Sequence, residues 1–261
     1  MKLPYLPPLS SVHGQKVDDL TLYVHLLMIA LFIGWSGYFL YAIWRFRKGR
    51  NPKADYVGST THASSVIEVA VALVEGALLF GLAVPMWAMS SEGFPDPKTS
   101  TVIRVTARQF NWTARYPGAD GVFGKQDISL VSSENPMGII AKDPKLKNTD
   151  TNGLDDILLE SNEIAVPVNK PVIAYISSLD VIHSFKVVTM RVTQDANPGM
   201  IIPIHFIPTV IGTNMIQCSQ LCGNGHYNML GLFKVMSQQD FDAWLQSKPK
   251  IGAAAASAGF E

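Results

Sequence analysis

The sequence predicts two membrane-spanning helices followed by an all-β domain that forms a sandwich or a barrel. Three observations support this. The chain is 48% hydrophobic and only 16% charged, which is more apolar than a typical soluble domain. Its apolar residues gather in two long runs near the N-terminus, and short strand-like runs separated by turn residues follow. We divide the chain into a membrane anchor (1–90), a linker (91–100), a β domain with a closing helix (101–247) and a mobile tail (248–261).

Two apolar runs are long enough to cross a bilayer, which takes about 20 residues of helix. The first extends from Leu20 to Trp44, and the second extends from Val66 to Met89 and includes Glu68 and Glu75. They could instead be buried helices of a soluble protein, but the rest of the chain offers nothing large enough to cover both. A cleaved signal peptide is disfavoured because the first run starts late and has no basic region directly before it.

The loop between the two runs predicts their orientation. Arg45 to Lys53 reads RFRKGRNPK and holds five basic residues in nine positions. By the positive-inside rule this loop is cytoplasmic, so the β domain lies outside, at the periplasmic face of a bacterial inner membrane that the chain crosses twice. Lys plus Arg and Asp plus Glu both number 21. Because the chain has no net positive charge to attract nucleic acid, we expect no nucleic acid partner. The two apolar runs indicate membrane lipid as a partner.

The β domain is predicted from runs rich in β-branched and aromatic residues. Gly118 to Asp156 interrupts them and is expected to be a surface excursion with little regular structure. Ser237 and Asp240 have the spacing of a capping box, which predicts a short closing helix. The predicted strand runs are 101–116, 163–168, 171–178, 184–192, 200–208 and 230–237.

The segment CSQLCGNGHYNM, from Cys218 to Met229, holds both cysteines of the chain. A disulfide is one interpretation for an exported domain, but it would close a very small ring and constrain the unfolded chain little. The pattern is Cys-x3-Cys-x3-His-x2-Met, in which the histidine is His226. Thiolate and thioether ligands together with imidazole favour copper, whereas a structural zinc site would gain little from a methionine.

The number of cysteines indicates how many copper ions to expect. A mononuclear blue-copper site uses one cysteine, and a second thiolate beside it would be prone to oxidation. Two thiolates that bridge two coppers remove this problem, and the pair then needs a second imidazole. His183 precedes a predicted strand and is the better candidate, because His205 lies inside an apolar strand and is expected to be structural.

The order of these features is similar to that of a known family. Two spans with a basic connecting loop, then DVIHSF, TQDANPGM and CSQLCGNGHYNM, resemble subunit II of the haem-copper respiratory oxidases, cytochrome c oxidase among them. The resemblance implies a cupredoxin-like Greek-key barrel that holds the binuclear copper centre CuA. It further implies bridging thiolates from Cys218 and Cys222, imidazole ligands from His183 and His226, and weak axial ligands from Met229 and the backbone carbonyl of Gln220.

The resemblance also implies a function. The chain would be an electron-transfer subunit of a proton-translocating oxidoreductase. It would accept electrons from an external donor, cytochrome c or a cytochrome-containing complex, and pass them to haem in subunit I. That subunit would carry the haem and CuB where oxygen is reduced, and further oxidase subunits would complete the assembly.

The sequence departs from the family pattern at three positions. Gln220 replaces a glutamate that helps to bind magnesium in relatives, which puts that ion in doubt. Phe110 replaces the first of two tryptophans, the one that is taken to receive the electron, and Trp112 matches the second. Either residue could receive the electron, or the two could simply be opposite sides of a strand. Glu75 occupies a position where many relatives have proline.

Two carboxylates of the second span are candidates for a proton path. Glu68 resembles the family's glutamate at the cytoplasmic mouth of a proton channel, although the helix dipole also stabilises a carboxylate near a helix N-terminus. Glu75 lies about two turns further along, and an intramembrane carboxylate is a functional candidate or is hydrogen-bonded to a neighbouring helix.

Other functions remain open at this stage. A membrane nitric oxide reductase subunit could carry the same copper motif. A quinol oxidase subunit II keeps the spans and the fold but lacks the copper ligands, and the intact motif counts against it. A copper-delivery protein would present fewer ligands in a flexible loop.

Overall fold

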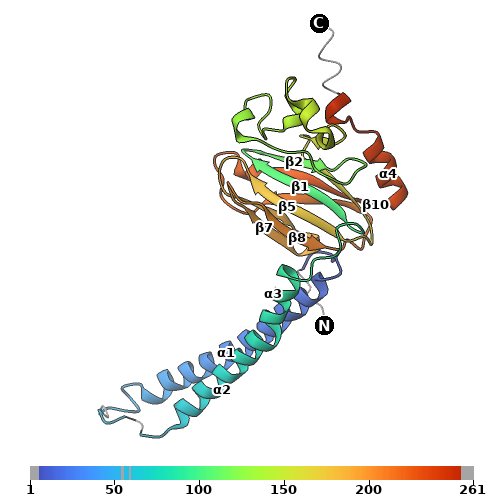
Figure 1. Cartoon of the computed structure of the whole chain (residues 1–261). Coiled ribbons are helices and arrows are strands. Elements are labelled where there is room, and N and C mark those ends of the chain that lie inside the picture. The colour runs from blue at the N-terminus through green and yellow to red at the C-terminus, as the bar shows by residue number, and fades with distance from the viewer. Residues whose placement is uncertain (1–5, 54–55, 59, 254–261) are drawn as a thin grey trace. The chain divides into compact units, whose positions relative to one another are not determined.

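The structure, a computed structural model, describes residues 6–53, 56–58 and 60–253 (Figure 1). The chain divides into two compact units. Residues 16–92 form a helical unit, and residues 7–15 join residues from 93 onward in a β unit.

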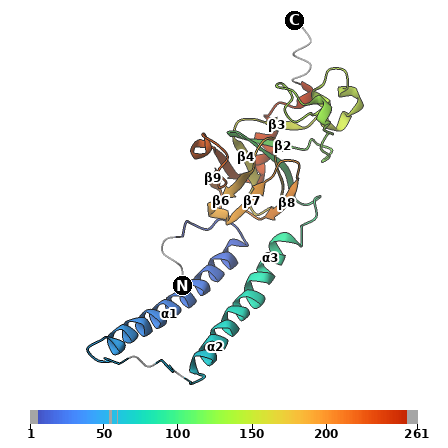
Figure 2. The ribbon, with the colours of Figure 1, turned by 90° about the vertical axis from the view of Figure 1, so that its left-hand side faces the viewer.

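The helical unit contains both predicted spans, which Figure 2 shows as two long helices. The first helix, α1 (Gly14–Phe46), starts earlier than Leu20 because its first turns are polar and hydropathy could not detect them. The second span comprises α2 (Ala63–Leu78), a π-helical turn (Leu79–Ala83) and α3 (Val84–Ser91). The π turn directly precedes α3, whose first turn contains Pro85. Because proline has no backbone N–H, it cannot donate the hydrogen bond of a regular helix at this point.

The β unit contains two five-stranded sheets, which confirms the all-β prediction. One sheet has the order β3-β2-β1-β5-β8 and the other has the order β4-β10-β9-β6-β7. Strands β1 and β5 pair in parallel, as do β4 and β10. The strands are β1 (Thr101–Arg108), β2 (Asn111–Tyr116), β3 (Ile157–Leu159), β4 (Glu163–Pro167), β5 (Val172–Ser178), β6 (His183–Val187), β7 (Val192–Ala196), β8 (Ile202–Phe206), β9 (Gly212–Cys218) and β10 (Leu230–Met236).

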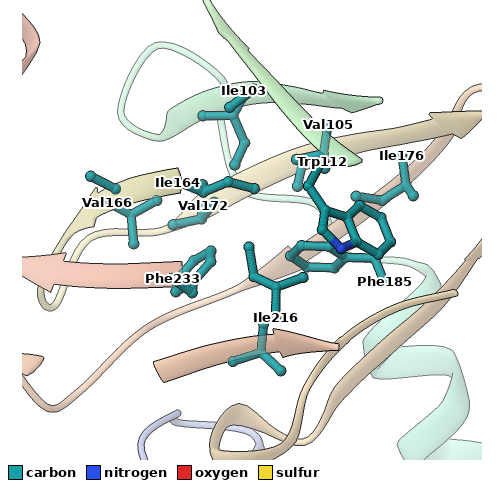
Figure 3. Close-up of a cluster of buried hydrophobic side chains, with 14 of the residues drawn as sticks. Ile103, Val105, Trp112, Ile164, Val166, Val172, Ile176, Phe185, Ile216 and Phe233 are labelled. Carbon is teal, nitrogen blue, oxygen red and sulfur yellow. The ribbon is translucent and has the colours of Figure 1, made fainter. Parts of the chain in front are cut away.

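Large apolar side chains fill the space between the sheets (Figure 3). Alternate residues of each strand point inward, as the two-residue period of a strand requires. Trp112 and Phe185 meet edge to face with ring centroids 5.6 Å apart, and neither side chain reaches solvent. The helix α4 (Gln238–Gln246) closes the domain, and Ser237 caps it by accepting a hydrogen bond from the amide of Asp240. This confirms the predicted closing helix, with Ser237 as its N-cap.

The excursion from Gly118 to Asp156 is a compact lobe. It is irregular, as expected, with four short 3-10 turns, but it has its own apolar cluster. Met137, Ile139 and Ala141 pack there against Ile251, which is 6% exposed. The described start of the expected tail is therefore not free but docked on the lobe, because Ile251 donates a backbone hydrogen bond to Asp156. Residues 254–261 of that tail lie outside the described residues.

Residues 7–15 form part of the β unit through main-chain pairing. The amide of Ser10 donates to the carbonyl of Thr189 at 2.8 Å, and the amide of Thr209 donates to the carbonyl of Ser10 at 2.9 Å. The Ser11 hydroxyl donates to the buried carbonyl of Met190 at 2.6 Å. These bonds hold the segment that leads into α1 against the loops after β6 and β8.

Candidate metal centre

Two neighbouring strands bring the predicted ligands together. His183 is the first residue of β6 and Cys218 is the last residue of β9, and these strands pair antiparallel. The rest of the motif forms the loop between β9 and β10, which we call the ligand loop (Cys218–Met229). The loop closes on itself, because the amide of Cys218 donates to the carbonyl of Met229 at 3.3 Å.

The sulfur and nitrogen atoms lie close together within this arrangement. The Sγ atoms of Cys218 and Cys222 are 3.7 Å apart, far from the roughly 2.05 Å of a disulfide, so both thiols are free. The Nδ1 atom of His183 is 3.9 Å from Cys218 Sγ, and that of His226 is 3.6 Å from Cys222 Sγ. Each cysteine therefore has its own imidazole.

Two further donors flank the sulfur pair. The Sδ atom of Met229 lies 3.7 Å from the Cys222 sulfur, and the carbonyl oxygen of Gln220 lies 3.1 Å from the Cys218 sulfur. Met229 is fully buried, whereas Gln220 is exposed at the surface. All six residues thus direct atoms toward one place.

This donor set suits copper. His183, Cys218 and Cys222 place one ligand atom each within 4.8 Å of one another. Thiolate, thioether and imidazole ligands favour copper over harder cations, which prefer oxygen ligands. Two sulfurs at van der Waals separation, each with its own imidazole, are compatible with a binuclear CuA site.

Asp180 orients His183 from outside the donor set. Its carboxylate lies 2.8 Å from Nε2 of His183, so the other ring nitrogen, Nδ1, faces the sulfurs. Burial alone would raise the pKa of Asp180, but hydrogen bonds from the amides of Gln109 and Val181 and from His183 outweigh burial and lower the pKa. The carboxylate is therefore ionised at neutral pH, as an acceptor of these bonds should be.

The Cys222 thiol is protonated in the metal-free chain at neutral pH. Burial and the neighbouring thiol of Cys218 raise the pKa of Cys222 to about 11. Cys222 is 4% exposed, so water stabilises its thiolate poorly. A metal ion that binds here must displace this proton, which ties metal uptake to proton release.

Gln109 links the loops that carry the ligands. It lies between β1 and β2, and its backbone amide donates to the Asp180 carboxylate at 2.7 Å. Its side-chain amide donates to the backbone carbonyl of Cys222 at 2.6 Å. One residue from a third loop therefore contacts both halves of the site. Neither Gln109 nor Asp180 was predicted from the sequence, although Asp180 opens the DVIHSF segment and its position three residues before His183 could have indicated a partner.

The two aromatic candidates approach different residues of the site. Phe110 is 37% exposed and lies over the ligand loop, where a Cβ added at Gly225 would come within 2.4 Å of its ring. Trp112 is fully buried, and its ring lies edge to face with the ring of His183 at 6.3 Å. Gly223 has a φ of 130°, in the region that favours glycine, and also faces Phe110. Both aromatic rings thus contact the ligand-bearing segments.

The two span carboxylates lie far from this centre in the sequence and belong to the helical unit. Glu68 lines a hollow of about 520 Å3 together with Trp35 and Tyr38 of α1. Glu75 is exposed on α2 and does not line that hollow. His205 lies on β8, and its ring centroid is 4.7 Å from that of Phe94.

Comparison with known proteins identifies the family. The family model described as cytochrome C oxidase subunit II, periplasmic domain, matches residues 101–235. Alternative cytochrome c oxidase subunit 2 of Bradyrhizobium diazoefficiens is 35% identical over 152 residues, which are 58% of this chain and 52% of that relative. The match therefore spans about half the length of that relative.

Two further relatives align with almost the whole chain. Cytochrome c oxidase subunit 2 of Cereibacter sphaeroides is 28% identical over 92% of this chain and 78% of the relative. Probable cytochrome c oxidase subunit 2 of Rickettsia bellii is 29% identical over 97% of this chain and 86% of the relative. Since the family model covers more than half of the chain, and covers the strands and loop that hold the donor atoms, this chain belongs to the cytochrome c oxidase subunit II family.

Proposed function

We propose that this chain is the electron-transfer subunit of a respiratory haem-copper oxidase. It accepts electrons from a donor outside the membrane and passes them to haem in subunit I, where oxygen is reduced. The observation that carries the proposal is the convergence of two free thiols, two imidazoles, a buried thioether and a backbone carbonyl within one loop and the strand beside it.

Six residues hold CuA in this proposal. The thiolates of Cys218 and Cys222 would hold the copper pair, and the imidazoles of His183 and His226 would each supply one further ligand. Met229 and the Gln220 carbonyl would contribute weaker ligands. The bound pair would supply one-electron redox chemistry in a site whose ligands need to move little. The six ligand positions are His183, Cys218, Gln220, Cys222, His226 and Met229.

The residues around the donors hold this geometry fixed. Asp180 keeps the His183 ring in one orientation, and the pairing of Cys218 with Met229 fixes both ends of the ligand loop. Cys222 and Met229 are buried, so the surrounding core excludes water from that side of the centre. A rigid scaffold of this kind favours electron transfer because the site does not need to rearrange.

The surface near the centre suits protein partners. Leu221 and Tyr227 of the ligand loop are 82% and 83% exposed, and Phe110, which lies against Gly225 of the same loop, is 37% exposed. Exposed apolar side chains of this kind are typical of contact surfaces. We assign this surface to the electron donor or to subunit I, with Phe110 and Trp112 as candidates for the first residue to receive the electron.

The helical unit anchors the chain in the bacterial inner membrane, with the copper domain on the periplasmic side. Both apolar helices are long enough to cross the bilayer. Glu68 lines a hollow between α1 and α2 and is the better candidate for a proton path, whereas Glu75 is retained only as a second position on that path. The donor and the companion subunits are proposed from the family.

The alternative functions have less support. The relatives reported above are named as cytochrome c oxidase subunits, and none is named as a nitric oxide reductase or a quinol oxidase. A quinol oxidase subunit would also have no use for the intact donor set.

The experiment is pulsed reduction of the intact complex purified from its native membrane. The pulse should bleach the copper absorbance, which should then recover at the rate at which reduced-haem absorbance grows in a companion chain, because the reduced centre passes its electron to that haem. In Cys222→Ser this coupled phase should disappear, whereas Lys145→Gln, a change at an exposed position of the lobe, should retain it. Haem reduction at an unchanged rate in Cys222→Ser would contradict the proposal, and a nitric oxide reductase among the companion chains would favour the alternative.

A further inference from the structure

Two arginines face each other on the outer surface of the sheet that the lobe covers. Arg104 of β1 pairs directly with Arg115 of β2, and Tyr175 of β5 pairs with Arg104 on the other side. Like charges directly opposite one another on neighbouring strands are destabilising. The fold therefore needs negative charge at this point.

Asp156 provides part of that charge. Its Oδ2 accepts from Nε of Arg115 at 2.9 Å, and Arg115 also donates to the carbonyl of Gly124 at 2.9 Å. Arg115 is only 2% exposed, yet its Nη1 atom is buried without a hydrogen-bond partner. One NH2 group of a buried guanidinium thus remains unsatisfied.

No carboxylate of the described residues forms an ion pair with Arg104. It donates to the side-chain oxygen of Gln126 at 3.1 Å and lies over the ring of Phe123 at 4.5 Å. Its Nε atom is buried without a partner. Among the described residues, Asp156 is the only carboxylate in ion-pair contact with either arginine. The two guanidinium groups and this carboxylate leave one positive charge uncompensated.

A cavity of about 50 Å3 lies at these groups. Both arginines line it, together with Gln126 of the lobe and the hydroxyl-bearing Thr106 and Ser177, whose oxygens are 3.3 Å apart. One water needs roughly 10–15 Å3 of such volume, so only a few atoms of oxygen size fit. The space suits a small inorganic anion and is too small for a nucleotide.

We propose that this cavity between the outer sheet face and the lobe is a binding site for a small inorganic anion. The anion accepts hydrogen bonds from Nε of Arg104 and Nη1 of Arg115, and it neutralises the cross-strand pair of positive charges. Its binding fastens the lobe, which contributes Gln126 and Phe123, to the sheet. The site is separate from the donor atoms of the metal centre.

The test uses the full chain in detergent, with denaturant unfolding followed by tryptophan fluorescence. Sodium chloride and sodium phosphate are compared with sodium gluconate at equal ionic strength, because gluconate is too large for the cavity. A ligand that binds only the folded state stabilises it in proportion to the logarithm of its concentration once the site is saturated. We expect the unfolding midpoint to rise with chloride or phosphate and not with gluconate. The two titrations distinguish a monatomic ion from an oxyanion.

Variants assign the effect to this cavity. Arg104→Gln should abolish the anion-dependent shift, and Arg104→Lys should weaken it because the forked donor is lost. Lys145→Gln removes the same charge from an exposed position of the lobe and should retain the full shift. In crystals grown with bromide, an anomalous peak should lie between the two guanidinium groups. Equal midpoints in all three salts, or equal shifts in the wild type and Arg104→Gln, would overturn the proposal.

Discussion

Individual residues around the donors determine how rigidly the centre is held. Asp180 and Gln109 bind no metal in this account, but they connect the His183 segment, the ligand loop and the turn between β1 and β2. Each hydrogen bond involves a backbone group or an ionised carboxylate, so loss of one partner leaves a polar group without compensation. The ligand positions therefore depend on residues that a ligand motif does not contain.

Gln109→Leu tests this connection directly. The variant leaves the carbonyl of Cys222 without its 2.6 Å donor, while the backbone bond to Asp180 remains. We expect a loss of about 1–2 kcal/mol in the free energy of unfolding of the full chain, measured with denaturant. Gln194→Leu is the control, because among the described residues the Gln194 side chain bonds only to the adjacent Asp195, and it should change stability by less than about 0.5 kcal/mol. Equal losses in both variants would argue against a bridging role for Gln109.

At the scale of elements, the segment that precedes α1 should respond to pH. Burial lowers the pKa of His13 below its usual value, a bond to the carbonyl of Arg191 raises it in part, and the nearby His205 lowers it. The undocked segment then binds a proton more readily than the docked one. Docking is strongest above the ordinary pKa of histidine, about 6.5, and weakens as the pH falls through the lower value of the docked state.

Amide exchange measures this docking. The amides of Val12 and Thr209 take part in the pairing between residues 7–15 and the β unit. After correction for intrinsic exchange rates, their protection should fall between about pH 7.5 and about pH 5.5. In His13→Gln the protection should vary less over the same range. Protection that is independent of pH in the wild type would contradict the prediction.

The buried ion pair between Arg115 and Asp156 joins the lobe to the sheet. Asp156→Asn keeps the shape of the side chain but leaves the Arg115 charge buried without its partner. We expect the free energy of unfolding to fall by about 3–5 kcal/mol. Arg115→Met combined with Asp156→Leu removes both charges and should lower the free energy of unfolding much less than Asp156→Asn does. A double variant as unstable as Asp156→Asn would show that lost packing, and not the unpaired charge, causes the effect.

The elements with a clear hydrophobic or capping pattern could be predicted from the sequence. Elements that are stabilised mainly by contacts with distant parts of the chain could not. The apolar runs and the capping residues of α4 were detectable because burial and capping use local signals. Strand β9 reads GTNMIQC and lacks a clear apolar alternation, since several of its side chains face outward. The docking of Ile251 on the lobe depends on contacts with residues more than 100 positions away, which no local pattern contains.

The same distinction applies to the candidate site. The ligand loop was readable because its donors are close in sequence and chemically distinctive, and His183 was found through its place before a strand. Gln109 lies more than 100 positions before Cys222 in the chain, and its side-chain amide looks like that of any surface glutamine. Only the folded arrangement of three loops gives it a role.

At the scale of the whole molecule, the orientation of the chain in the membrane follows from its charges. The basic loop from Arg45 to Lys53 should be cytoplasmic, and the β domain should be periplasmic. An alkaline phosphatase reporter fused after Pro52 should be inactive, and one fused after Ser247 should be active. A cytoplasmic reporter at the same two positions should give the opposite pattern. If both fusions report the same side, the two-span topology is wrong.

The central claim is that Cys218 and Cys222 bridge two coppers that share one unpaired electron. Copper content and the electron spin resonance spectrum of the oxidised full chain test it most directly. We expect two coppers per chain and hyperfine lines in excess of those that one copper nucleus can produce. Cys222→Ser should abolish the shared state, because a hydroxyl is a harder and weaker bridge, whereas Met229→Leu should keep it with a shifted potential. One copper per chain, or a shared spectrum that survives Cys222→Ser, would contradict the account.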